Sequence, residues 1–138
     1  MNSNSQRALL VLLLFYGVAS LVHFVHNAEL IAEYPNLPAS WTRADIYLGW
    51  VALTSIGLAG WLLVSRGYRR VGLLVLAAYA ALGMDSLGHY LLAPLAAHSL
   101  AMNLTILVDV AAAALVLIEV ARQMALGRNR SPTPGRSI

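Results

Sequence analysis

Four apolar segments follow one another along the chain, separated by short polar or proline-containing connections. The segments cover residues about 8–31, 46–64, 71–92 and 100–121. Each has a length close to the roughly 20 apolar residues that an α-helix needs to cross the hydrocarbon core of a bilayer. The pattern predicts an all-α chain that folds as a membrane-spanning, antiparallel four-helix bundle, with residues 1–122 forming one domain.

The connections between the segments carry signals for helix ends. Pro35 and Pro38 lie too close together for the stretch between the first two segments to be helical. Thr42 and Asp45 have the spacing of a capping box, which predicts that the second helix begins here. Residues 123–138 are polar and basic and contain several Ser, Pro and Gly residues, so we expect a disordered tail.

The basic residues predict how the bundle lies in the membrane. All nine are Arg, and all but one fall at the same end of the predicted helices. Those at this end are Arg7, Arg66, Arg69, Arg70, Arg122, Arg128, Arg130 and Arg136. Since cytoplasmic loops carry the excess of Arg and Lys, we expect both termini in the cytoplasm and a multi-pass protein of the cytoplasmic (inner) membrane.

Composition narrows the class of function. The chain is 59% hydrophobic and 11% charged, whereas soluble domains average about 25% charged residues. The net charge of +3 comes from Arg residues beside apolar segments, so it indicates topology rather than nucleic-acid binding. The absence of Cys excludes disulfides, thiolate metal sites and a Cys nucleophile. The expected partners are the lipid bilayer, an apolar small-molecule ligand and further subunits in a homo- or hetero-oligomer.

Polar side chains interrupt three of the four apolar segments and form the candidate site. At a rise of about 1.5 Å per residue, His23, Asp85 and Asp109 lie about 20–22 Å from the Arg-bearing end, and His26 and His89 about 27–28 Å from it. Ionisable groups at this depth are costly, which makes them functional candidates. We expect them to converge in the outer leaflet between the first, third and fourth helices. Asp85 and His89, four residues apart, should share one helix face.

The first hypothesis is a transition-metal site. Imidazole and carboxylate donors without sulfur suit Zn²⁺, non-haem iron or Cu²⁺, and a water in an open coordination position would be activated. The expected ligands are His23, His26, His89, Asp85 and Glu29. Asp109 lies one level lower and is expected to orient a ligand by accepting its second ring proton. His98, in the loop before the fourth helix, is expected to have no role.

A second hypothesis is proton transfer to a lipid-like molecule by carboxylates and imidazoles. The run from Asn103 to Asp109, with Thr105 between them, resembles a helix of the emopamil-binding sterol isomerase family. In that family an Asn and a Thr precede an acidic residue at the same spacing, after a helix that carries His and Glu. The resemblance implies that Asp109 is a catalytic proton shuttle, with Asp85 and His89 taking the places of the family's His and Glu in reversed order. It thus implies an intramembrane lipid-binding or lipid-isomerising protein.

Two further alternatives remain open. A haem could lie between His89 and one of His23 and His26, with Gly83 and Gly88 leaving room for it. The chain could also be an accessory subunit whose polar groups only hold its helices together or contact a partner. The chain as a whole resembles small four-helix integral membrane proteins of bacteria, a resemblance that implies no particular reaction.

Overall fold

The computed structural model describes residues 3–128, and this part of the chain is helical with short connections. The long helices are α1 (Ser3–Glu29), α2 (Arg43–Ser65), α3 (Arg69–Leu82) and α5 (Leu100–Arg128). The third span continues from α3 through the 3₁₀ segment η2 (Gly83–Gly88) into α4 (His89–Leu92), and the connections contain the 3₁₀ turns η1 (Ile31–Glu33) and η3 (Leu95–Ala97). Within residues 3–128, four stretches are long and apolar enough to cross a membrane: Asn4–Glu29, Arg43–Ser65, Arg69–Leu92 and Leu100–Gly127. The predicted all-α chain with four spans is therefore confirmed.

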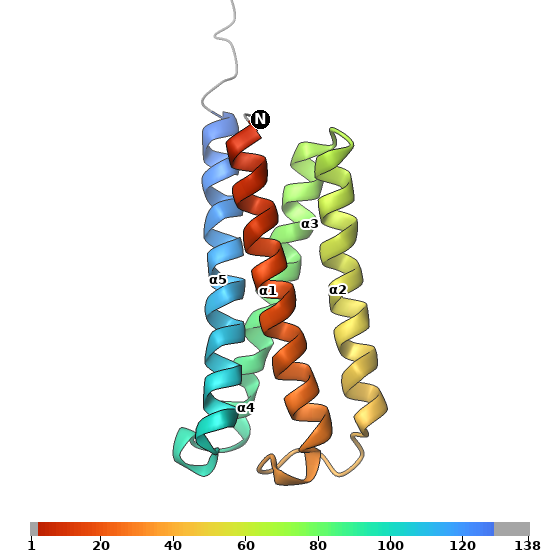
Figure 1. The fold of residues 1–138 in the computed structure, drawn as a ribbon, viewed down its shortest axis with the longest axis vertical. Coiled ribbons are helices and arrows are strands. Elements are labelled where there is room, and N and C mark those ends of the chain that lie inside the picture. The colour runs from red at the N-terminus through yellow and green to blue at the C-terminus, as the bar shows by residue number, and fades with distance from the viewer. Residues whose placement is uncertain (1–2, 129–138) are drawn as a thin grey trace, which may run out of the picture.

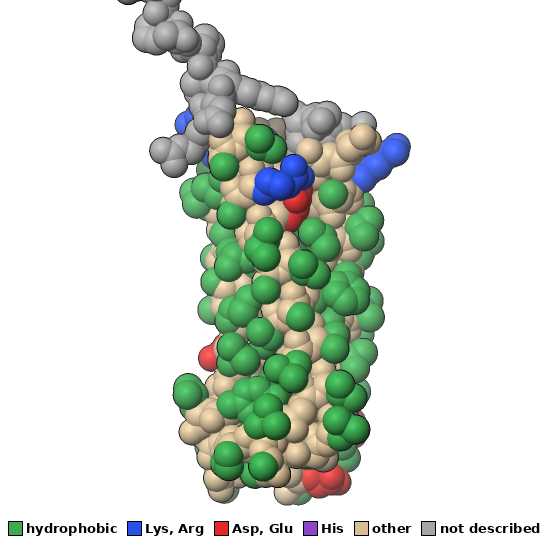
Figure 2. All heavy atoms as spheres, turned by 90° about the vertical axis from the view of Figure 1, so that its left-hand side faces the viewer, with side chains coloured by type: hydrophobic (Ala, Val, Ile, Leu, Met, Phe, Trp, Pro, Cys, Tyr) green, Lys and Arg blue, Asp and Glu red, His purple; other side chains and the backbone are tan. Residues whose placement is uncertain are grey.

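The bundle has two chemically different ends. The start of α1, the turn between α2 and α3, and the end of α5 lie together at one end, and the other connections lie at the opposite end (Figure 1). We call the first the basic end because it carries Arg7, Arg66, Arg69, Arg70 and Arg122. We call the second the histidine end because His26, His89 and His98 lie near it. Figure 2 shows hydrophobic side chains along the length of one face, with the Arg and Lys colour on this face seen only at the basic end.

The predicted start of the second helix is confirmed. Thr42 is the N-cap of α2, and its Oγ1 accepts a hydrogen bond from the Asp45 backbone N–H at 3.3 Å. The Asp45 carboxylate in turn accepts from the Thr42 backbone N–H at 2.9 Å. These reciprocal bonds satisfy donors that helix geometry leaves without partners.

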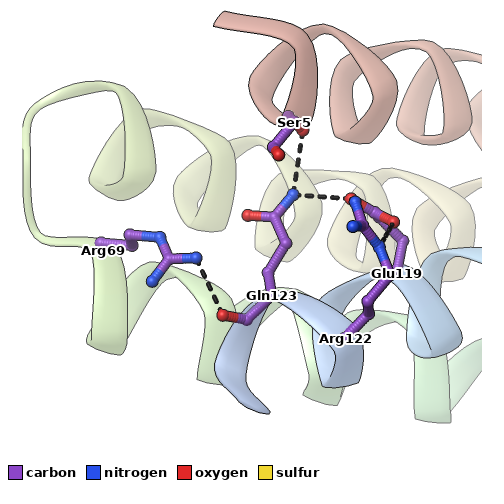
Figure 3. A network of polar contacts seen from close by, with 5 residues as sticks. All are labelled: Ser5, Arg69, Glu119, Arg122 and Gln123. Atoms are coloured by element: carbon purple, nitrogen blue, oxygen red, sulfur yellow. Dashed lines mark hydrogen bonds and ion pairs between the residues drawn. The ribbon is translucent and has the colours of Figure 1, made fainter. Parts of the chain in front are cut away.

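The last helix is longer than its hydropathy predicts. Residues 123–128, assigned to the tail from the sequence, belong to α5, while the rest of that tail, 129–138, lies outside the described residues. The reason is Gln123, which is 1% exposed. Its side-chain Nε2 donates to the Ser5 backbone carbonyl at 2.9 Å and to the Glu119 carboxylate at 2.8 Å. Its backbone carbonyl accepts from the Arg69 guanidinium at 2.9 Å (Figure 3). Gln123 thus joins α1, α3 and α5 at the basic end.

Glycines bring α2 and α3 close together in the part of the hairpin nearest its turn. A Cβ added at Gly57 would lie 2.7 Å from the Tyr79 ring, and one added at Gly60 would lie 2.9 Å from Leu76. Such close approach through small residues is typical of helix packing in membranes. Farther from the turn α2 and the third span diverge, so that they lie farther apart at the histidine end than at the basic end (Figure 1).

The third span changes from α-helix to 3₁₀-helix at Gly83. The Tyr16 hydroxyl of α1 occupies the place where a Cβ at this position would lie, so the contact requires glycine. In a 3₁₀-helix residues three apart are aligned, and Gly83, Ser86 and His89 accordingly form the buried side. Asp85 is exposed instead. The prediction that Asp85 and His89 share one helix face assumed an α-helix, whereas this segment is a 3₁₀-helix.

Candidate functional site

A cavity of about 460 Å³ lies at the histidine end between α1, α2 and the η2–α4 segment. We call it the histidine cavity. Its polar lining residues are His23, Asn27, Asp45, Asp85, Ser86 and His89. Its walls are otherwise mainly apolar and include Phe24, Trp41, Ile46, Leu53, Leu82 and Leu92. This size, with a few polar groups in an apolar wall, is typical of small-molecule binding sites.

The histidine cavity has an open side between α2 and the third span. Ala52 on α2 and Leu82 and Asp85 on the third span line the cavity and are also exposed on the surface of the bundle. All three belong to stretches long and apolar enough to cross a membrane. The open side therefore faces the region that lipid chains fill when the spans are in a bilayer.

His23 presents an imidazole nitrogen with a free lone pair. The residue is 2% exposed, and its Nδ1 lies 3.5 Å from Thr105 Oγ1. The Thr105 hydroxyl donates its only hydrogen to the Met102 carbonyl at 3.0 Å, so in this contact it accepts from His23 Nδ1–H. The Nε2 atom of neutral His23 then carries a lone pair, and no hydrogen bond to it occurs within residues 3–128.

His89 lies beside His23 in the same cavity. The two ring centroids are 5.5 Å apart and the rings are nearly perpendicular, at 78°. Asn27 Nδ2 lies 3.2 Å from His89 Nε2, and an amide nitrogen can only donate, so His89 Nε2 accepts and its Nδ1 carries the proton. The structure thus brings together two of the three histidines that the sequence assigned to the site.

Asp109 reaches the histidine cavity only through Ser86. Asp109 is 1% exposed and does not line the cavity. Ser86 does line it, and its hydroxyl donates to Asp109 Oδ2 at 2.7 Å. The other carboxylate oxygen, Oδ1, is buried and has no hydrogen-bond partner. Sequence reasoning missed Ser86, although its spacing of three from both Gly83 and His89 is the signal that a 3₁₀ segment would give.

His26 and Glu29 do not line the histidine cavity. His26 Nδ1 shares a hydrogen bond of 2.9 Å with the Tyr34 hydroxyl, and burial raises the pKa of Tyr34 to about 12, so the phenol stays neutral. Glu29 accepts from the Tyr47 hydroxyl at 2.8 Å and forms an ion pair with Arg43 at 3.3 Å. Both residues thus have other partners, which join the end of α1 to the following loop and to α2.

His98, for which the sequence predicted no role, lies against His89. It is 6% exposed, and its ring centroid is 6.2 Å from that of His89. Its Nδ1 donates to the Pro94 carbonyl at 3.1 Å, and its Nε2 is buried without a partner. The turn η3 returns the chain over the bundle, which buries this ring next to the site.

The side chains do not form a complete metal centre as they stand. In the described part of the chain, no group of three or more His, Asp or Glu residues is arranged so that it could hold a metal ion. His23, His89 and Asp85 line one cavity, while His26 and Glu29 are bonded elsewhere. The arrangement offers an acceptor nitrogen on His23 and a buried carboxylic group behind Ser86.

No family model, curated protein or solved structure matches the chain.

Proposed function

We propose that this multi-pass membrane protein binds a small, mainly apolar molecule from the bilayer in the histidine cavity and exchanges a proton with it. The observation that carries the proposal is the free Nε2 of His23 in an apolar cavity of about 460 Å³. The exposed position of Ala52, Leu82 and Asp85 at its open side supports entry from the lipid. The cavity volume falls within the range of roughly 300–1,000 Å³ found for such ligands.

The proposed chemistry uses two proton carriers. Neutral His23 accepts a proton from the ligand at Nε2, while its Nδ1–H remains bonded to Thr105. Asp109, when protonated, passes a proton to the Ser86 oxygen while Ser86 gives its own hydroxyl proton to the ligand, which reverses the hydrogen bond that Ser86 donates to Asp109 Oδ2 at 2.7 Å. The cycle closes when the proton taken up by His23 is returned to Asp109. Removal of one proton and addition of another leave the ligand's composition unchanged, so the net reaction is an isomerisation. Asp85, at the open side, is placed to contact the polar end of the ligand.

A transition-metal site is the second candidate, because two imidazoles and a carboxylate line the same cavity. Zn–N bonds are about 2.0–2.1 Å long, and ring centroids 5.5 Å apart are compatible with two histidines on one ion. Zn²⁺, non-haem iron or Cu²⁺ would be held by His23 and His89, and Asp85 would have to move towards them to become the third ligand. His26 and Glu29 could join only after leaving Tyr34 and Arg43.

Filling the cavity tests the first proposal. Gly49 lines the histidine cavity, and a Cβ added there would meet only the Phe24 ring at 3.8 Å, so we expect the side chain of Gly49→Leu to extend into the cavity. The control is Ala111→Leu, at an exposed position on α5 that does not line this cavity. Both proteins are purified at equal folded yield, and the small molecules they retain are extracted and quantified by mass spectrometry.

We expect the parent protein and Ala111→Leu to retain one defined apolar compound besides phospholipid in near-stoichiometric amounts, and Gly49→Leu to lose most of it. Equal retention by all three proteins, or no defined compound in the parent, would refute binding in the histidine cavity. Metal analysis of the same samples tests the second candidate, because a near-stoichiometric transition metal that Gly49→Leu also loses supports the metal site instead.

A further inference from the structure

A second hollow, of about 290 Å³, lies between α1 and α2 nearer the basic end. We call it the α1–α2 groove and define it by Leu10, Leu14 and Gly17 on α1 and by Thr54, Gly57 and Trp61 on α2. A hydrogen bond of 3.1 Å from Trp50 Nε1 to Ser20 Oγ joins the two helices between this groove and the histidine cavity. The two hollows are therefore separate sites.

The α1–α2 groove is apolar and has space along its floor. An added Cβ at Gly17 would meet no atom within 4 Å, and Leu14 is 61% exposed beside it. From Leu10 to Gly17 the groove extends about 10 Å along α1, at about 1.5 Å per residue. One leaflet contributes about 15 Å of hydrocarbon, so the groove matches most of the length of one leaflet's acyl chains.

A positive charge lies at the basic end of this groove. Arg7 precedes Leu10 by three residues and Leu14 by seven, which places it on the same face of α1. It is exposed and forms no ion pair or hydrogen bond within residues 3–128. The acidic residue at this end of the bundle, Glu119, is paired with Arg122 at 2.7 Å. An anion at the membrane surface would therefore find an unneutralised guanidinium next to the groove.

We propose that the α1–α2 groove binds one anionic phospholipid from the leaflet at the basic end, with an acyl chain along the groove and the phosphate at Arg7. Arg is suited to phosphate because its guanidinium donates two parallel hydrogen bonds. A helix from a second copy is the competing occupant. However, an α-helix with its side chains is about 10–12 Å across, so it would cover a hollow of this size without filling it.

Tryptophan fluorescence provides the test, because Trp50 and Trp61 line the groove. The protein is reconstituted into phosphatidylcholine vesicles with a minor fraction of lipid that carries bromine on its acyl chains, either as phosphatidylglycerol or as phosphatidylcholine. Bromine quenches tryptophan at short range. We expect brominated phosphatidylglycerol to quench more than the same fraction of brominated phosphatidylcholine. Equal quenching by the two lipids would overturn the proposal.

Three variants assign any selectivity to the groove. Arg7→Gln should abolish the excess quenching by the anionic lipid, and Gly17→Leu, which fills the groove, should reduce quenching by both lipids. The tryptophan fluorescence of Gly49→Leu, whose substitution lies in the histidine cavity, should be quenched as much as that of the parent. If Arg7→Gln and Gly17→Leu both keep the parent's quenching, no lipid is held at this groove.

A cysteine at the groove tests for the second copy. The chain has no Cys, so Gly17→Cys introduces a single thiol. We expect it to stay monomeric under mild oxidation in the vesicles, because lipid covers it. Efficient formation of a disulfide-linked dimer would show that another copy occupies the groove and would overturn the lipid assignment. Neither result depends on whether the histidine cavity binds a ligand.

Discussion

Replacing Gly83 with Ala tests whether the contact with Tyr16 fixes the start of the 3₁₀ segment. The Tyr16 hydroxyl occupies the place of the new methyl group, and the Ala113 Cβ would lie 3.0 Å from it. Tyr16 is 1% exposed, so it has little space into which to move. An added methyl group in such a packed site costs about 1–3 kcal/mol, which offsets the gain of about 0.8–1.0 kcal/mol from replacing Gly by Ala in a helix.

Gly17→Ala on α1 is the matched control, because its new methyl group meets no atom within 4 Å. It gains helix propensity without the overlap, so Gly83→Ala should have a free energy of unfolding about 1–3 kcal/mol lower than that of Gly17→Ala. Unfolding is followed by circular dichroism in mixed micelles with increasing dodecyl sulfate. Adding Tyr16→Phe to Gly83→Ala should recover part of the loss, since it removes the overlapping oxygen. If Gly83→Ala is as stable as Gly17→Ala, the contact does not constrain the third span.

The remaining predictions concern the site and the topology. Ser86→Ala leaves the buried Asp109 carboxylic group without its hydrogen bond and should destabilise the bundle by about 1–3 kcal/mol in the same unfolding assay, whereas a loss near zero would mean that the pair is not formed. Ala39→Cys, in the exposed loop at the histidine end, should react with an impermeant maleimide from outside intact cells, as the Arg-rich opposite end implies; labelling only after lysis would reverse the topology. If elemental analysis finds a transition metal, His23→Ala should lose most of it, while His26→Ala should keep it because His26 is bonded to Tyr34. If His26→Ala loses the metal at equal folded yield, His26 is a ligand.

The spans could be predicted from the sequence because the signals for them are local. A run of apolar residues has to be long enough to cross the hydrocarbon core, and this length can be counted along the chain. The capping box at Thr42 and Asp45 is equally local, since both partners lie within one helical turn. No knowledge of the neighbouring helices was needed for either prediction.

The orientation of the polar groups was harder to predict because it depends on contacts between distant segments. Depth along the helix placed His23 level with Asp85 and Asp109, and His26 level with His89, whereas in the structure His23 lies beside His89. The assumption of a continuous α-helix placed Asp85 on the buried side. The contact between Tyr16 and Gly83 and the resulting 3₁₀ segment put Ser86 there instead. His98 shows the same limit, because no local pattern indicates that η3 returns it against His89.

The placement of both hollows follows from how α2 is held. Glycine contacts fasten α2 to α3 near their turn, and α1 packs more extensively on α5 than on α2. The contact between α1 and α2 therefore depends on separate side-chain bonds, from Trp50 to Ser20 and from Tyr47 to Glu29. Space remains on either side of the Trp50 bond, with the histidine cavity towards one end and the apolar groove towards the other. The two hollows along this helix pair therefore differ in chemistry, because only the cavity has polar groups from η2 and α4 on its wall.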